Sequence, residues 1–511
     1  MPLTRPGPPM PPAAVAGAPE GARRPPVRGE APPPARTGSA APPDEPVLRA
    51  LRWEALLGDP DDPANPYGRA ALAAAGGADL PRPDPAWGPL PPGAGARGHD
   101  EPAGQLVRVL RPWLRRDAAL AHDWVIRPLL TGAPRGMAEP SAAAGHRARL
   151  AELLAPAALV AATGDLLRTT ARQVAALGSG RPGARQWQPV LAAVFADLLA
   201  CESLTAVALR ALDTADDGGG DVLPAATGYV VPRLVGGLLG DLELVLNDSL
   251  SGPAATEREA LARQSAIRTA ARVDRTAVAS GRARLIRLLP RLADASEQPG
   301  HPAPRELFRL GAPAGTGPGT GPDTGPGSGL HDADAYDDAY DDAYDDANDD
   351  AYGGGHGGGR GPVPPAPDAT ALAAVLPAAA GRPDRAGDTP ARVALTRFAR
   401  RLATEQRALR GPSRSAAATT SDPAARALAD RQALLLLAAA VLGVQEAAAE
   451  DRGGFLGGCD WALLALERVV RRLGVPLPGD APDPGDAVWT ELTERIHAGV
   501  DCDVYGTRLL W

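Results

Sequence analysis

The sequence predicts an all-α protein whose helical parts are separated by long disordered segments. Ala and Leu, the strongest helix formers, dominate its 44% of hydrophobic residues, whereas aromatic residues make up only 4%. Gly and Pro, with 59 and 56 residues, together form more than a fifth of the 511 residues, which is close to the range of disordered chains. Apolar residues recur with the 3.6-residue period of a helix, and no stretch contains several alternating strand patterns in succession.

Apolar stripes place the helices along the chain. The clearest one spans residues 186–212, where an apolar residue stands at nearly every third or fourth position. We expect Pro112 and Pro128 to kink or split a helix at 105–130, because proline lacks the amide hydrogen that a helix interior needs. The other helices are expected at 46–57, 67–75, 142–177, 225–246, 254–292, 389–410, 423–448, 459–473 and 485–499.

Composition divides the chain into five parts. Residues 1–45 and 312–368 are rich in Pro, Gly or Asp and have no helical period, so they are predicted to be a disordered tail and a disordered linker. The helical parts are an N-terminal region at 46–155, a bundle at 156–311 and a C-terminal extension at 369–511.

All 53 cationic side chains are arginine. This usage fits the codon bias of a GC-rich genome, because the arginines are interspersed with Asp and Glu instead of forming a basic patch. The net charge of −8 includes ten aspartates at 331–352, so the rest of the chain is near +2. The balance gives no argument for nucleic acid or an anionic membrane as a partner.

The repeat at 332–352, DADAYDDAYDDAYDDANDDAY, is predicted to be a solvated linker. Weak cation binding is one alternative. Another is terpene chemistry, because DDAYD fits the DDxxD pattern that holds magnesium diphosphate in terpene synthases, and Asn247, Asp248 and Ser251 resemble the start of the second metal motif of those enzymes. Ala255 stands where that motif needs a glutamate, and the order of the two motifs is reversed, so no metal site is predicted.

The remaining signals favour a reducing cytoplasm. Cys201, Cys459 and Cys502 are far apart and form no CxxC pair, so neither a disulfide framework nor a zinc site is expected. The N-terminus is interrupted by prolines and lacks the apolar region of a signal peptide. The longest apolar run, at 433–444, is too short to span a bilayer. We therefore expect a cytoplasmic protein without a membrane partner.

Two stretches resemble the acyl-CoA dehydrogenase family, in particular its long forms with a helical C-terminal extension. The first is similar to the N-terminal entry of that group and reads RWEALLGDPDDPANPYGRAALAAA at 52–75. The second is similar to the long antiparallel helices of the family's C-terminal bundle and reads RQWQPVLAAVFADLLACESLTAVALRAL at 185–212, followed by ATGYVVPRLVGGLLGDLELVL at 226–246. The resemblance continues in RLIRLLPRLA, ELFRLGAP and the ending DVYGTRLL, and covers about half of the chain.

The resemblance implies FAD-dependent α,β-dehydrogenation of an acyl thioester by a homo- or hetero-oligomer. It places a flavin contact at Gln188, whereas GSGRPG at 178–183 replaces the Arg and Phe-Gly that usually precede this contact. Ala254 lies nearest the position of the family's catalytic glutamate, and Glu257 and Glu259 are displaced from it. A carboxylate that removes an α-proton needs close placement, so catalytic residues stay unassigned.

The sequence also departs from the family between its two helical parts. The N-terminal region runs into the bundle with only a few residues between them, and the family's β-domain of roughly 100 residues cannot fit there. The resemblance therefore implies weak or lost activity. The alternative function is that of a non-catalytic helical partner or scaffold for an intact homologue.

Overall fold

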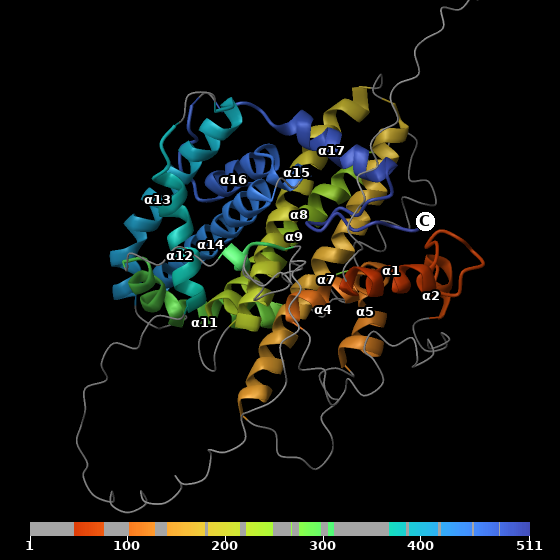
Figure 1. Cartoon of the computed structure of the whole chain (residues 1–511), viewed down its shortest axis with the longest axis horizontal. Helices are drawn as coiled ribbons and strands as arrows, with labels where there is room; N and C mark the ends of the chain where they lie inside the picture. The colour runs from red at the N-terminus through yellow and green to blue at the C-terminus, as the bar shows by residue number, and fades with distance from the viewer. Residues whose placement is uncertain are drawn as a thin grey trace, which may run out of the picture. The chain divides into compact units, whose positions relative to one another are not determined.

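A computed structural model of the chain confirms the all-α class that the sequence predicts (Figure 1). Its described residues contain no strand, and the only pairing of β type among them is a single antiparallel bridge between Val500 and Arg508. Asp44–Trp511 form one compact unit. The structure describes residues 45–75, 102–127, 141–178, 182–214, 221–248, 267, 275–297, 305–310, 367–384, 388–416, 421–451, 454–479 and 481–511.

The helices follow the periodic stretches closely. In the first part they are α1 (Glu45–Leu57), α2 (Arg69–Ala75), α4 (Ala103–Arg116), α5 (Ala118–Ala121), the π-helix η2 (His122–Ile126), α7 (Ser141–Ala176), α8 (Pro182–Thr214), α9 (Val222–Asn247), α11 (Arg275–Ala295) and the 3₁₀ turn η3 (Arg305–Leu307). The second part contains α12 (Pro367–Ala380), α13 (Pro390–Ser415), α14 (Pro423–Glu450), α15 (Gly454–Gly457), α16 (Asp460–Arg472) and α17 (Gly485–His497).

Three of these elements were not expected from the sequence: α12, α15 and η3. The sequence of α12 is almost entirely Ala, Leu, Val and Pro, so it has no polar face against which an apolar stripe could be recognised. The segments predicted to be disordered, 1–45 and 312–368, lie outside the described residues except at their edges. At one of these edges, Pro367 and Asp368 already belong to α12.

Local capping signals explain where α13 and α14 begin. Thr389 precedes Pro390 at the start of α13, and its hydroxyl accepts a hydrogen bond from the backbone N–H of Arg392 at 3.3 Å. Asp422 precedes α14 in the same way and accepts the N–H of Ala424 at 2.9 Å. Each cap satisfies an amide that has no partner within the helix, and a proline in the first turn loses nothing by lacking its own amide hydrogen.

Pro112, which was expected to kink or split its helix, does not split it, since α4 runs through this residue. The helix ends instead at Asp117, whose backbone is extended, with φ −159° and ψ 115°. The carboxylate of Asp117 accepts the N–H of Leu120 at 2.8 Å, which starts the next helical segment. The helix therefore ends at Asp117, a residue whose side chain caps the following helix, and Pro112 is accommodated within the buried helix α4. Pro128 lies outside the described residues.

Helix α8 lies at the centre of the fold and packs against α4, α7, α9, α14, α16 and α17 (Figure 1). Phe195, Leu198 and Leu199 of α8 are fully buried. The boundary expected between residues 155 and 156 falls within α7, which continues through Pro156. The helices of the expected C-terminal extension thus share a hydrophobic core with the bundle in the described part of the chain.

In the described part of the chain, four helices are long and apolar enough to cross a membrane: α7, α8, α9 and α14. This finding corrects the expectation that no apolar segment reaches that length, which considered only the uninterrupted run at 433–444. Between 72% and 94% of the apolar window of each helix is buried against other helices. Their hydropathy is accounted for by packing in the core, where a helix that is apolar all round is expected.

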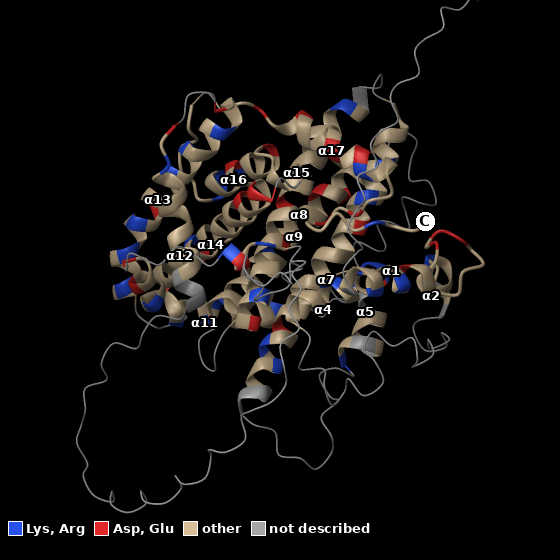
Figure 2. Ribbon diagram, in the orientation of Figure 1, with Lys and Arg blue, Asp and Glu red and all other residues tan. Residues whose placement is uncertain are grey.

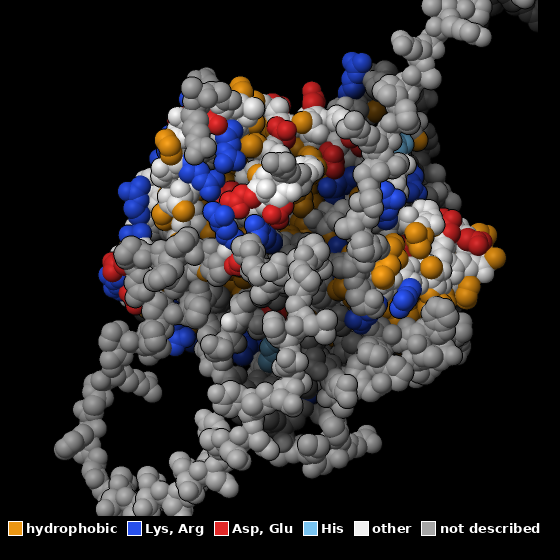
Figure 3. Space-filling model, in the orientation of Figure 1, with side chains coloured by type: hydrophobic (Ala, Val, Ile, Leu, Met, Phe, Trp, Pro, Cys, Tyr) orange, Lys and Arg blue, Asp and Glu red, His pale blue; other side chains and the backbone are white. Residues whose placement is uncertain are grey.

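Charges of both signs occur across the surface. On the face shown in Figure 3, arginine and carboxylate side chains are interspersed with apolar ones. Figure 2 shows the same mixture along most of the ribbon, with cationic residues gathered near α13. The mixed charges agree with the interspersed Arg, Asp and Glu residues of the sequence. Helix α13 differs because most of its charged residues are arginines.

Candidate functional site

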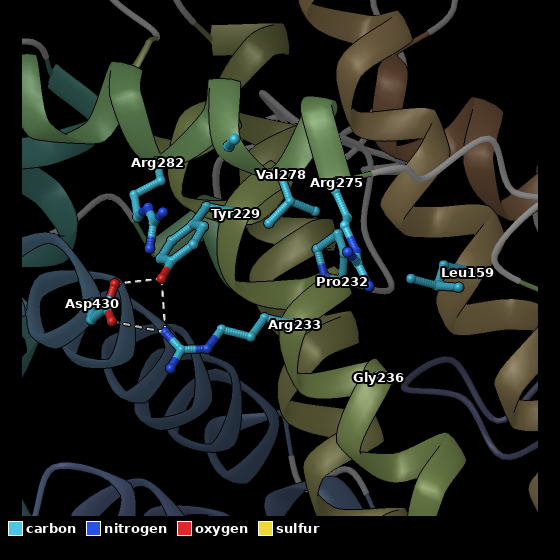
Figure 4. Close-up of a pocket in the computed structure, with 10 residues that line it drawn as sticks. Leu159, Tyr229, Pro232, Arg233, Gly236, Arg275, Val278, Arg282 and Asp430 are labelled. Carbon is cyan, nitrogen blue, oxygen red and sulfur yellow. Dashed lines mark hydrogen bonds and ion pairs between the residues drawn. The ribbon is translucent and has the colours of Figure 1, made fainter. Parts of the chain in front are cut away.

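The candidate site is a cavity of about 560 Å³ formed mainly by α9 and α11 (Figure 4). Leu159 of α7 and Asp430 of α14 complete its wall. Its volume lies within the roughly 300–1,000 Å³ of small-molecule pockets in proteins. The lining residues are Leu159, Tyr229, Pro232, Arg233, Gly236, Arg275, Val278, Ala279, Arg282 and Asp430.

A glycine allows the two main helices to approach each other at this cavity. A Cβ atom on Gly281 of α11 would lie 3.2 Å from the backbone nitrogen of Tyr229 and 3.3 Å from the carbonyl oxygen of Ala225, both in α9. A larger residue would therefore push α11 away from α9. The close approach places the guanidinium of the next residue, Arg282, 5.8 Å from the centroid of the Tyr229 ring, which is within the range of a cation–π contact.

Tyr229, Arg233 and Asp430 form a hydrogen-bonded group at one end of the cavity (Figure 4). The hydroxyl of Tyr229 donates to Oδ1 of Asp430. Nη1 of Arg233 donates to the Tyr229 hydroxyl at 2.7 Å and to Oδ2 of Asp430 at 2.9 Å. Burial raises the pKa of Tyr229, and its hydrogen bond to Asp430 acts in the same direction. The phenol therefore stays protonated at neutral pH.

The other two arginines of the cavity have no such partner. Within the described residues, neither Arg275 nor Arg282 forms an ion pair with a carboxylate. Asp430, the one carboxylate among the described lining residues, is engaged by Arg233 and Tyr229. The lining thus has three positive charges against one negative charge, beside the apolar surfaces of Pro232 and Val278 and their neighbours.

The lining of the cavity is suited to binding an anion rather than to catalysing a reaction of that anion. A guanidinium group presents planar N–H donors that match carboxylate or phosphate oxygens. A general base would have to be unprotonated and free to reach a substrate. Tyr229 is held in its protonated form, and Asp430 accepts hydrogen bonds through both of its oxygens.

A second group of charged residues lies deep in the core and joins distant segments. Arg111 of α4 forms ion pairs with Glu202 of α8 and, at 2.8 and 3.0 Å, with Asp501 and Asp503 near the end of the chain. Arg115 forms ion pairs with Asp501 and with Glu54 of α1. We call these six residues the buried ion-pair network. Each is at most 8% exposed, which leaves no access for a ligand.

Within this network, the protonation states depend on the balance of carboxylates and arginines. Burial by itself would raise the pKa of Asp501, but Arg115 and Arg111 outweigh it and hold the pKa below its usual range. Burial raises the pKa of Glu202 to about 8, with Arg111 opposing the shift. Four carboxylates share two arginines, so acidic groups outnumber cationic ones within the network. The network is a structural element rather than a binding site.

Gln188, the flavin contact that the resemblance implies, lies half-buried near the start of α8 and does not line the cavity. Its neighbours Gln186 and Trp187 donate hydrogen bonds of 2.7 and 3.0 Å to Oδ2 of Asp248. The implied flavin contact and the cavity between α9 and α11 therefore do not coincide, and the residues around the cavity do not fit an FAD site that includes Gln188.

Of the other positions that the sequence singled out, Asn247 and Asp248 lie at the end of α9. Ala254, Glu257 and Glu259, the Asp repeat and Ser251 all lie outside the described residues. Among the residues that are described, no three His, Cys, Asp or Glu side chains gather in a way that could hold a metal ion.

The residues that line the cavity were not predicted from the sequence to form a site. Tyr229 and Arg233 stand four positions apart in the mostly apolar sequence of α9 and so share one face of the helix. This polar pair was a signal that could have been noticed. Asp430, which is 201 positions from Tyr229, had no such signal, because nothing in the sequence relates α14 to α9.

Comparison with protein-family models, with curated proteins and with solved structures gave no match to this chain. The class of protein is therefore defined by its fold and its cavity: an all-α protein with an arginine-lined pocket. The resemblance to acyl-CoA dehydrogenases stays a hypothesis from the sequence.

Proposed function

We propose that this chain is a non-catalytic helical protein that binds a small anionic ligand in the cavity between α9 and α11. The observation that carries the proposal is the pair Arg275 and Arg282, which line a cavity of about 560 Å³ without a carboxylate partner among the described residues. Within the described residues, no carboxylate neutralises these two cationic groups, which stand beside an apolar wall.

The shape and lining of the cavity suggest a ligand with two parts. Val278, Ala279 and Pro232 offer apolar surface for a short hydrocarbon or ring, and the arginines offer donors for a carboxylate or phosphate. Asp430 is neutralised by Arg233, so the negative charge it carries repels an incoming anion less than a free carboxylate would. An acyl thioester whose carrier has phosphate groups is one member of this ligand class.

Calorimetric titration of the purified chain tests this function, with octanoate, inorganic pyrophosphate and octanoyl-CoA as probes. We expect at least one probe to bind, and we expect the double variant Arg275→Ala/Arg282→Ala to weaken binding by roughly tenfold or more, since each hydrogen bond to a charged group contributes roughly 1.5–3 kcal/mol. Arg287→Ala is the matched control, because Arg287 is an exposed arginine of α11 that does not line the cavity. Equal affinities of the double variant and the control would refute the proposal.

A second candidate is acyl-CoA dehydrogenase-like activity, as the sequence resemblance implies. One observation favours it: α9 and α11, the two helices that form the cavity, flank residues 249–274, where the resemblance places the catalytic base. Oxidation of octanoyl-CoA by the purified chain with an artificial electron acceptor distinguishes the two candidates. Turnover would establish this second function, and binding without turnover would leave the first.

A further inference from the structure

Cationic residues gather along helix α13 (Figure 2). Its 26 residues include seven arginines and one carboxylate, Glu405. Arg397, Arg400, Arg401 and Arg407 are exposed. Arg400 and Arg401 follow Arg397 by three and four residues, and Arg407 follows Arg400 by seven, so the four lie along one side of the helix. We call these four residues the arginine stripe of α13.

Most of this positive charge is not neutralised by the described part of the protein. Arg400 forms an ion pair with Asp384 at 3.1 Å, and Glu405 forms an ion pair with Arg431 of α14. Arg397, Arg401 and Arg407 have no carboxylate partner among the described residues. Arg397 donates to the carbonyl oxygen of Gly479 at 3.5 Å, and Arg407 donates within α13 itself.

A groove lies beside the arginine stripe. It has a volume of about 530 Å³ and is lined by residues of the stripe and by Pro476, Leu477 and Pro478. The side chain of Leu477 is 40% exposed, which makes it one of three large hydrophobic residues exposed in the described part of the chain. The groove thus combines guanidinium groups with a small apolar surface.

We propose that the arginine stripe and its groove bind the Asp/Tyr repeat of the same chain, residues 332–352. The repeat contains ten aspartates, four tyrosines and no arginine or lysine. Its carboxylates match the guanidinium groups of the stripe. Its tyrosines match both the guanidinium faces, on which aromatic rings stack, and the apolar surface of Leu477 with its two prolines.

The length of the intervening chain permits this contact. Tyr352 is 15 positions before Pro367, the first residue of α12, and 15 residues can span at most roughly 50 Å. Helix α12 packs directly against α13. A helix of 26 residues is roughly 39 Å long, so every position of the stripe lies within reach of the repeat.

The physical character of the contact follows from its exposed charges. Each exposed ion pair is weak and is screened by salt. Many pairs at once, and an effective concentration in the millimolar range from the short connection, favour the contact within one chain over a contact between chains. The repeat would then neutralise a basic surface that otherwise attracts nucleic acid or anionic membranes.

Fluorescence anisotropy of a labelled peptide with the sequence of residues 331–352 tests this inference. Two full-length proteins are compared: the natural chain, and a chain in which the ten aspartates of the repeat are changed to asparagine. We expect the peptide to bind the asparagine chain at least tenfold more tightly than the natural chain, in which the repeat competes. The affinity should fall strongly between 50 and 500 mM NaCl.

Charge variants of the stripe complete the test. In the asparagine chain, Arg397→Ala/Arg401→Ala/Arg407→Ala should weaken peptide binding by tenfold or more, whereas Arg287→Ala/Arg291→Ala, two exposed arginines of α11, should leave it unchanged. If the alanine variant fails to fold, Arg397→Lys/Arg401→Lys/Arg407→Lys should fold and retain most of the affinity. Equal binding of the peptide to the natural and asparagine chains would overturn the inference. Equal binding of a single-stranded DNA or of phosphatidylserine vesicles to both chains would do the same, since the stripe would then be free.

Discussion

Trp511 donates the N–H of its indole ring to the carboxylate of Glu54, a residue 457 positions earlier in the chain. The same ring lies against the guanidinium groups of Arg115, Arg116 and Arg168, at 5.6 to 5.9 Å from its centroid. Glu54 also forms an ion pair with Arg115, which connects Trp511 to the buried ion-pair network. The side chain of Trp511 is therefore anchored to residues of α1, α4 and α7.

Removal of the Trp511 ring should destabilise the protein. Trp511→Ala deletes the hydrogen bond to Glu54 and three cation–π contacts, and it leaves one oxygen of a buried carboxylate without its donor. We expect the free energy of unfolding to fall by about 1–3 kcal/mol, measured by urea denaturation. Leu510→Ala is the control, because Leu510 is 56% exposed and its loss should change the stability by less than about 0.5 kcal/mol. Similar effects of the two variants would show that the ring is not an anchor.

Loss of Arg111 should be more damaging. Arg111→Met keeps an unbranched apolar stem but leaves Glu202, Asp501 and Asp503 without their shared partner in a buried site. Removing one partner of a buried ion pair costs about 3–5 kcal/mol, because the remaining charge has lost its solvation as well as its partner. Thermal and urea unfolding should both report this loss. Arg287→Met, at an exposed site on α11, should be close to neutral, and a neutral Arg111→Met would contradict the proposed role of the network.

The protonation of Glu202 predicts how the stability depends on pH. Its pKa in the folded protein is raised to about 8, above the ordinary value of 4.5, because the side chain is buried. The folded state therefore holds a proton that the unfolded state has released, and the stability falls as the pH rises from about 4.5 to about 8. Glu202→Gln removes this titration. Urea denaturation at pH 5, 6.5 and 8 should show a smaller decline for the variant, and parallel declines for both proteins would exclude a protonated Glu202.

The close approach of α11 to α9 can be tested at Gly281. Gly281→Val places a branched side chain where even a Cβ atom would lie 3.2 Å from the backbone of Tyr229. We expect a loss of about 1–3 kcal/mol, since added atoms in a packed contact force the helices apart. Binding of an anionic probe in the cavity should weaken as well. Gly237→Ala is the control in α9, because nothing lies within 4 Å of its Cβ position and alanine favours helix, so that variant should gain up to about 1 kcal/mol. An unchanged stability of Gly281→Val would mean that the helices can separate without cost.

We expect the protein to purify without flavin. The Arg and Phe-Gly positions of the dehydrogenase family are replaced in this sequence, and Gln188 does not line the cavity. An absorbance spectrum of the purified chain measures this directly, and added FAD should be removed by desalting. A flavin band of about one equivalent per chain would contradict the expectation. Gln188→Ala would then show whether that residue holds the cofactor.

Local signals in the sequence account for most helices. Asp422 and Pro423 mark the start of α14 because a cap and a first-turn proline act within a few residues of each other. The same kind of reasoning failed at Pro112, which lies within α4, because a proline's local cost can be offset by the packing of a buried helix. It also failed for α12, whose residues are apolar on all sides and so form no stripe.

The sequence by itself determined the all-α class, because helical hydrogen bonds join residues four positions apart and depend on composition and period. Only the tertiary structure brought Asp430 to Tyr229 and Trp511 to Glu54, across 201 and 457 positions. Such pairs form where apolar faces of different helices pack, and the geometry of that packing depends on the shapes of all the side chains at the contact. The cavity, the arginines that line it and the buried ion-pair network therefore belong to the fold as a whole.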